Sequence, residues 1–167
     1  MVIQIKWLTF TYKVSNKPSA NRVYVWRKLK KIGALPLQDS IFILPYNFKN
    51  LEHLQWLSVE IREMDGESFT FESNSIGINK DQDIINKFNE YVESLYEDVF
   101  DELQLIKENA NDLNTIEFIK LYKAFQEIRK KDYFNSDKGV QIFGTFKFIE
   151  KRIYEQEENL DEMDNME

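Results

Sequence analysis

The sequence predicts an α+β protein in which a strand-rich N-terminal half is followed by a helical C-terminal half. Residues 2–75 alternate short β-branched or aromatic runs with helical periodicity, whereas the chain beyond Ser75 shows helical periodicity alone. The length of 167 residues is about one domain's worth and is enough to bury a core. The composition is globular, because 43% of the residues are hydrophobic and only five are Gly and three are Pro.

The first strand is expected in residues 2–12, whose apolar side chains alternate to both faces, as is typical of a central strand. A helix should follow, with Ser19 as its N-cap and Gly33 as the residue that ends it in the left-handed conformation. The helical wheel predicts a buried stripe of four residues, namely Val25, Trp26, Leu29 and Ile32.

Four more elements are expected in the N-terminal half: strands at 34–38 and 40–45, a helix at 49–64 and a strand at 67–73. Pro36 makes the first of these strands an edge or bulged strand, since proline has no N–H to donate. In the last strand, Phe69 and Phe71 are expected to point inward. The order strand, helix, strand, strand, helix, strand predicts a ferredoxin-like βαββαβ arrangement.

Three amphipathic helices are expected in the C-terminal half, at about 83–109, after a cap at Thr115 or Asn114, and at about 140–157. The predicted organisation is a ferredoxin-like α+β subdomain at 1–75, a helical subdomain at 80–157 packed on it, and an acidic tail at 158–167.

The absence of Cys among the 167 residues excludes disulfides, thiolate metal sites and cysteine nucleophiles, and fits a reducing compartment. The first ten residues, MVIQIKWLTF, contain Lys6 and no small-residue cleavage site, so no signal peptide is expected. No run approaches the ~18 apolar residues of a membrane span. We therefore expect a cytoplasmic protein without a membrane partner.

Catalytic residue types are scarce. His53 is the single histidine and is expected on the outer face of its helix. With one His and no Cys, a zinc site would need carboxylates almost alone, so none is expected. Asp132 is the one acid flanked by bases and aromatics, in KKDYF, and an ion pair or helix-end contact is the expected role. The alternative is a metal-dependent hydrolase or nuclease that uses Asp132. We expect no enzyme activity, no cofactor and no metal.

Positive charge is concentrated at the N-terminal end. Residues 1–38 hold eight Lys/Arg and no acid, whereas the remainder holds 14 basic and 29 acidic residues. A helix N-terminus with an arginine in its first turn is suited to an oxyanion or phosphate. The candidate anion-binding residues are Ser19, Asn21, Arg22 and Trp26. The alternative is that Arg22 pairs with an acid of the C-terminal helices.

The outer face of the same helix is a candidate nucleic-acid contact. Its basic and aromatic residues are Tyr24, Arg27, Lys28 and Lys31.

The stretch SANRVYVWRKLKKIGALPLQDSIFILP resembles the pattern R-V-x-V-W-R-x-L-K-x-x-G-A-x-x-L-Q-x-G-V-Y-V-L-P of the ChrB N-terminal domain family, the chromate-resistance regulators. The segment IRKKDYFNSDKG is similar to that family's R-x-x-D-F/Y-F segment. The pattern has Gly where this chain has Ser40. The matching residues are Arg22, Trp26, Arg27, Gly33, Ala34, Gln38, Leu44, Pro45, Asp132, Tyr133 and Phe134.

The resemblance implies a non-enzymatic regulator of transcription or accessory factor in chromate resistance, with an oxyanion ligand or DNA as candidate partners. A more distant resemblance links the chain to the middle domain of the regulator PaaX and to the small CRISPR adaptation nuclease. That nuclease places an acid at the end of its first strand, where this chain reads TFTYKVS, so nuclease chemistry is not expected. By analogy with such folds we expect a homo-oligomer, with the Pro36 edge as a candidate contact.

Overall fold

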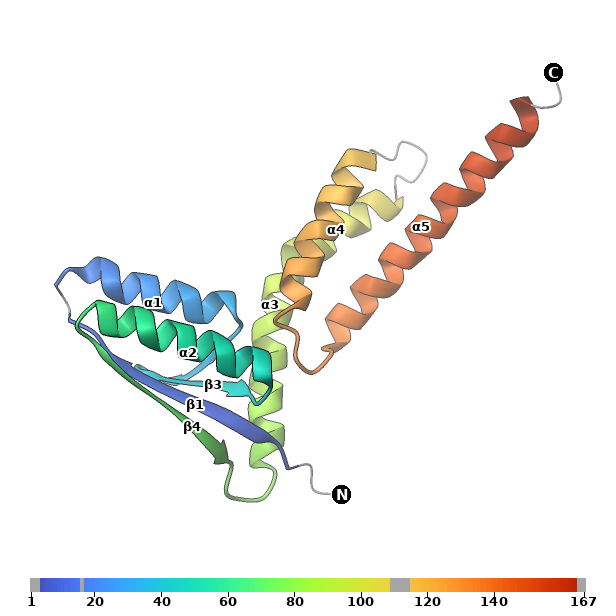
Figure 1. Cartoon of the computed structure of the whole chain (residues 1–167). Helices are drawn as coiled ribbons and strands as arrows, with labels where there is room; N and C mark the ends of the chain where they lie inside the picture. The colour runs from blue at the N-terminus through green and yellow to red at the C-terminus, as the bar shows by residue number, and fades with distance from the viewer. Residues whose placement is uncertain (1–3, 16, 109–114, 165–167) are drawn as a thin grey trace. The chain divides into compact units, whose positions relative to one another are not determined.

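The computed structural model describes residues 4–15, 17–108 and 115–164, and the side chains as far as residue 155 (Figure 1). The chain forms two compact units, residues 1–88 and 89–167, and the boundary between them lies inside a long helix. The composition of the sequence changes earlier, at Ser75. The element order is β1 (Lys6–Lys13), α1 (Ser19–Lys31), β2 (Leu35–Gln38), β3 (Ile41–Pro45), α2 (Phe48–Glu63), β4 (Glu67–Asn74), α3 (Lys80–Glu108), α4 (Thr115–Arg129) and α5 (Asp137–Asp164). The predicted α+β class and the predicted order of elements are confirmed.

The sheet of the first unit has the order β2-β3-β1-β4, and every neighbouring pair is antiparallel. Helices α1 and α2 lie side by side over one face of this sheet (Figure 1). Leu8 and Phe10 of β1 are opposite Leu44 and Phe42 of β3, and all four are buried. Because side chains alternate along a strand, these even-numbered positions of β1 define one face.

Trp7 lies on the other face of the sheet and is buried. Its ring stacks on that of Phe88 of α3, with the ring centroids 5.9 Å apart and an interplanar angle of 4°. Phe69 and Phe71 are opposite Thr11 and Thr9, so they belong to this second face. Their exposed fractions are 51% and 53%, and the prediction that they point inward is therefore wrong. The two phenylalanines do share one face, as the alternation predicts, but α1 and α2 cover the opposite face of the sheet (Figure 1).

Helix α1 packs through Val25 and Leu29, which are fully buried. Trp26 is 49% exposed, so its predicted place in the buried stripe is wrong. The reason is geometric, because successive helical residues are rotated by about 100° and Trp26 falls on the flank of the stripe. The N-cap is Pro18 and it makes no side-chain cap bond, so Ser19 is the first helical residue and not the predicted cap.

The predicted left-handed Gly33 is confirmed, with φ 76°. The N–H of Gly33 donates to the carbonyl of Lys30 at 3.1 Å, and the N–H of Ala34 donates to the carbonyl of Leu29 at 3.0 Å. This pair of bonds is a Schellman motif, which satisfies carbonyls at the end of a helix. Ala34 is fully buried, so the turn leads directly into the core and on to β2.

The second unit is built from helices whose apolar faces meet in a core of Val92, Tyr96, Val99, Leu103, Leu121, Phe125, Ile142, Phe146 and Ile149. Phe125 contacts several aromatic rings of this core, and its ring centroid lies 5.6 Å from that of Tyr96 and 5.3 Å from that of Phe146. Helix α5 continues to Asp164, beyond the predicted end at about residue 157. Within the described ranges, no helix combines the length and the apolar character needed to span a bilayer.

Candidate functional site

One flank of α1 brings together three of the four predicted anion-binding residues. Ser19, Arg22 and Trp26 are spaced i, i+3 and i+7, so they follow one side of the helix, and Lys30 continues the row. The Lys30 ammonium lies over the Trp26 ring, 5.7 Å from its centroid. Asn21 falls on the other flank. We call Ser19, Arg22, Trp26 and Lys30 the Arg22 flank.

The first turn of α1 contains no acidic side chain that would compete with an anion. Arg22 is exposed and close enough to Tyr12 of β1 to affect its titration. Burial raises the pKa of Tyr12, and the positive charge of Arg22 partly opposes this rise. The guanidinium therefore lies near the place where β1 leads into α1. The pairing of Arg22 with an acid of the C-terminal helices stays a prediction.

The predicted nucleic-acid contacts lie on the outer face of α1, but they are not equivalent. Lys28 forms an ion pair with Glu60 of α2 at 3.2 Å and lies 5.2 Å from the ring centroid of Tyr24. Hydrogen bonding by Tyr24, and then by Glu60, raises the pKa of Lys28. Arg27 and Lys31 are exposed, so they remain the better candidates for phosphate contacts.

His53 is only half-exposed and lines a small pocket of about 90 Å³ between α1 and α2. The other lining residues include Lys28, Trp56 and Glu60. A pocket of this volume has room for a few water molecules and not for a substrate of ordinary size. His53 therefore lies on the flank of α2 that faces α1, and the prediction that it lies on the outer face of its helix is wrong.

Several residues of the family pattern have structural roles. Gly33 and Ala34 form the end of α1, as described above. Leu44 is buried opposite Leu8, and the carbonyl of Pro45 accepts a hydrogen bond from the side-chain amide of buried Asn50 at 2.9 Å. By contrast, Arg22, Trp26 and Arg27 on α1 and Gln38 at the end of β2 are exposed.

Asp132 organises the connection between α4 and α5. Its Oδ1 accepts from the backbone N–H of Ser136 at 2.9 Å, and its Oδ2 accepts from the Ser136 hydroxyl at 3.0 Å and from the Tyr96 hydroxyl at 3.3 Å. Burial, and then the nearby charge of Asp132, raises the pKa of Tyr96. A Cβ on Gly139 would collide with Oδ2 of Asp132, so the helix start fits closely around this carboxylate. Tyr133 and Phe134 are half-buried beside it.

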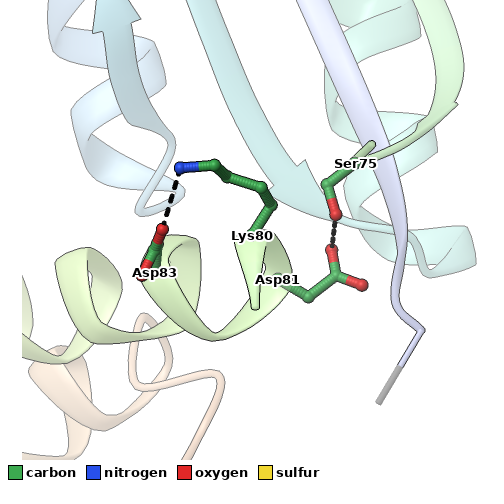
Figure 2. Close-up of polar contacts among 4 residues, drawn as sticks. All are labelled: Ser75, Lys80, Asp81 and Asp83. Carbon is green, nitrogen blue, oxygen red and sulfur yellow. Dashed lines mark hydrogen bonds and ion pairs between the residues drawn. The ribbon is translucent and has the colours of Figure 1, made fainter. Parts of the chain in front are cut away.

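Asp81 is a buried acid that lies just before the predicted start of its helix at about residue 83 and within the first turn of α3. Its exposed fraction is 7%, and its carboxylate accepts from the N–H of Ile5 at 3.0 Å, the indole Nε1 of Trp7 at 2.7 Å and the hydroxyl of Ser75 at 2.5 Å. Figure 2 shows the Ser75 contact, beside the exposed ion pair of Lys80 with Asp83. Burial would raise the pKa of Asp81, but the hydrogen bonds from Ser75, Trp7 and Ile5 outweigh it and lower the pKa. This carboxylate joins the start of β1, the end of β4 and the start of α3.

Among the described residues, no group of three or more His, Cys, Asp or Glu is arranged to hold a metal ion. The chain thus combines a four-stranded α+β unit with a helical unit, and the exposed residues of the family pattern on α1 are basic or aromatic. Residues 22–162 match the family model described as "Protein ChrB, N-terminal". The chain therefore belongs to the ChrB N-terminal family, which relates it to chromate resistance. No curated protein and no solved structure matches it.

Proposed function

We propose that this chain is a non-enzymatic regulatory or accessory protein of chromate resistance, and that the Arg22 flank is its oxyanion contact. The observation that supports this most is the exposure of Arg22 and Trp26. Both belong to the family pattern, yet neither is buried or caps a helix, whereas Gly33, Ala34 and Leu44 serve the fold. Exposed residues of this kind are better explained by binding than by packing.

The chemistry of the Arg22 flank suits a tetrahedral dianion. A guanidinium donates two parallel hydrogen bonds to an oxyanion, and the start of a helix adds N–H donors and a partial positive charge. Lys30 adds a second cation next to the Trp26 ring. Because Arg22 and Trp26 are exposed to water, we expect weak binding, with a Kd of about 0.1–1 mM. The 167 residues contain no thiol that chromate could oxidise.

Isothermal titration with chromate, sulfate and phosphate tests this proposal. We expect chromate to bind the wild type and to bind Arg22→Ala at least about tenfold more weakly, as expected for the loss of a charge-assisted bidentate contact. Arg62→Ala is the matched control, since Arg62 is an exposed arginine in the last turn of α2. Equal affinities in the three proteins, or no chromate binding by the wild type, would refute the ligand assignment.

The regulatory role has a separate test in cells. Deletion of the gene should lower the chromate concentration at which the source strain stops growing, and the wild-type gene should restore it. Complementation with Arg22→Ala should fail, while Arg62→Ala should succeed. Unchanged chromate tolerance after deletion would contradict the role in resistance, whatever the binding results are.

DNA is the second candidate partner, favoured by the exposed Arg27 and Lys31 beside the half-exposed ring of Tyr24. With Lys28 held by Glu60, such a surface offers two to three phosphate contacts. The logarithm of the binding constant should then fall with the logarithm of salt concentration with a slope of about −2 to −3. Fluorescence anisotropy with a labelled duplex measures this slope, and Arg27→Ala should reduce it by about one. A salt-independent signal would exclude this surface as the DNA contact.

A further inference from the structure

The two edges of the sheet differ in how well they are protected. β2 is four residues long, contains Pro36 and has a register shift between Pro36 and Gln38. Short length, proline and bulges are the features by which proteins block an edge against further pairing. The Pro36 edge, which the sequence suggested as an oligomer contact, is therefore the poorer candidate.

The β4 edge has none of these protections. β4 pairs with β1 over eight residues without a break, from Lys6 with Asn74 to Lys13 with Glu67. Its sequence, ESFTFESN, has no Pro and no Lys. Within the described part of the chain, β4 is the last strand of the sheet, so its alternate N–H and C=O groups point outward. Such a strand is a template for pairing with another strand.

Exposed aromatic side chains lie on this same edge strand. Phe69 and Phe71 stack with their ring centroids 6.3 Å apart, and about half of each side chain is exposed. An aromatic pair on an edge strand can extend across a new strand, because directly opposite side chains lie within contact distance. The edge thus offers backbone hydrogen bonds together with an apolar surface.

We propose that β4 pairs antiparallel with β4 of a second copy, with Thr70 on the two-fold axis, to form a continuous eight-stranded sheet. A two-fold axis perpendicular to the sheet leaves each face of the sheet on the same side in both copies. Because directly opposite residues point to the same face and side chains alternate along a strand, the numbers of two paired residues must add up to an even number. With Thr70 at the axis, Phe69 is opposite Phe71 of the second copy, and Phe71 is opposite its Phe69. Four aromatic rings then lie next to one another on one face.

The neighbouring registers fit less well. An axis at Glu72 would set two glutamates directly opposite each other, which is destabilising. An axis at Phe71 would place Phe69 opposite Ser73, and an axis at Phe69 would place Phe71 opposite Glu67. With the axis at Thr70, Ser68 is opposite Glu72 and no acid faces an acid. An axis at Phe71 or at Phe69 keeps one aromatic pair, Phe71 with Phe71 or Phe69 with Phe69, whereas the axis at Thr70 gives two, so the side-chain pattern favours the register centred on Thr70.

The cysteine-free chain allows this register to be mapped with single cysteines. In the proposed dimer the two copies of residue 70 have Cα atoms about 4.5–5.5 Å apart, which is within disulfide range. The two copies of residue 68 are four residue steps apart along the strand pair, roughly 14 Å, which is out of range. Under mild oxidation we expect Thr70→Cys to form a covalent dimer and Ser68→Cys to stay uncrosslinked. Crosslinking through Phe71→Cys but not through Thr70→Cys would overturn the register.

A matched pair of charge variants tests the pairing without relying on oxidation. Phe69→Lys with Phe71→Lys sets lysine opposite lysine twice in the proposed register, whereas Phe69→Lys with Phe71→Glu sets lysine opposite glutamate twice. Both variants lose the same aromatic surface at half-exposed positions, so circular dichroism should show both folded. In sedimentation velocity of the full chain, we expect the second variant to dimerise about tenfold more tightly than the first. Equal dimer affinities, or a wild type that is monomeric at every concentration tested, would overturn the proposal.

Discussion

Asp81 offers the sharpest test of what holds the first unit together. Its carboxylate is the common acceptor for Ile5, Trp7 and Ser75, which lie at the start of β1 and after the end of β4. We consider two substitutions, Asp81→Asn and Asp81→Ala. The matched control is Asp83→Asn, because Asp83 lies in the same first turn but is exposed and contacts Lys80 only through a surface ion pair.

The expected magnitudes follow from the donors that each variant leaves unsatisfied. Asp81→Ala removes all three acceptor contacts and leaves the indole N–H of Trp7 and the N–H of Ile5 without this partner in a mostly buried site. Each buried orphan donor costs about 1–3 kcal/mol, so we expect the free energy of unfolding to fall by about 3 kcal/mol. Asp81→Asn keeps one acceptor oxygen and should lower it by about 1–2 kcal/mol. Asp83→Asn should change it by less than about 0.5 kcal/mol.

Urea denaturation followed by tryptophan fluorescence is the natural assay. The chain has three tryptophans, Trp7, Trp26 and Trp56, and all lie in the first unit, so the signal reports the unit that contains Asp81. The same assay measures how the free energy of unfolding depends on pH. Because the pKa of Asp81 is lowered in the folded state, its ionised form stabilises the fold above the unfolded pKa of about 3.9. This stabilisation is lost as the pH falls through the folded pKa.

The difference in stability between wild type and Asp81→Ala should therefore be largest near pH 7 and shrink as the pH drops below about 4. The same experiment on Asp83→Asn should show a small difference throughout. A loss for Asp81→Ala no larger than that for Asp83→Asn would refute the structural role. A loss that does not change between pH 7 and strongly acidic solution would refute the ionised state of the buried carboxylate.

Further predictions concern packing at the helices. Leu29→Ala should lower the free energy of unfolding by about 2–5 kcal/mol because Leu29 is fully buried, whereas Trp26→Ala should lower it by about 0.5 kcal/mol or less. Urea denaturation compares the two variants, and equal losses would show that Trp26 contributes to the core as Leu29 does. Gly139→Ala should destabilise the second unit by about 1–3 kcal/mol because its Cβ would collide with the hydrogen-bonded carboxylate of Asp132. Gly144→Ala is its control in the same helix, with no atom near the added Cβ, and should stabilise by about 0.5–1 kcal/mol; thermal unfolding by circular dichroism checks both signs.

Local sequence patterns predicted the elements well, because the interactions that define helices and strands are short-range. Gly33 ended α1 in the left-handed conformation, as predicted, since a residue without Cβ adopts positive φ at little cost. The errors have two causes. Trp26 lies next to the buried stripe of α1 and not in it. Phe69 and Phe71 do share a face, but periodicity shows which side chains share a face and not whether another element covers that face.

The residues of the candidate site also divide into those that the sequence identified and those that only the structure revealed. Arg22 could be singled out from the sequence, because a basic residue in the first turn of a helix is a local feature. A helix-end contact of Asp132 was also predicted, and Ser136 at the start of α5 provides it. The role of Asp81 was not predicted, because its donors Ile5 and Trp7 are brought to it by long-range packing. Trp7 is 74 positions from Asp81, and Tyr96 is 36 positions from Asp132. In a single sequence, an acid buried by such contacts looks the same as an acid on a solvated helix face.

The sequence by itself determined the order of helices and strands, the concentration of basic residues on one helix and the resemblance to ChrB N-terminal domains. These properties depend on side-chain periodicity, charge and motif, which are written along the chain. Only the tertiary structure decided which faces are covered, which acids are buried and which sheet edge is left unprotected. Those properties depend on residues that are distant in sequence and meet only when the sheet forms.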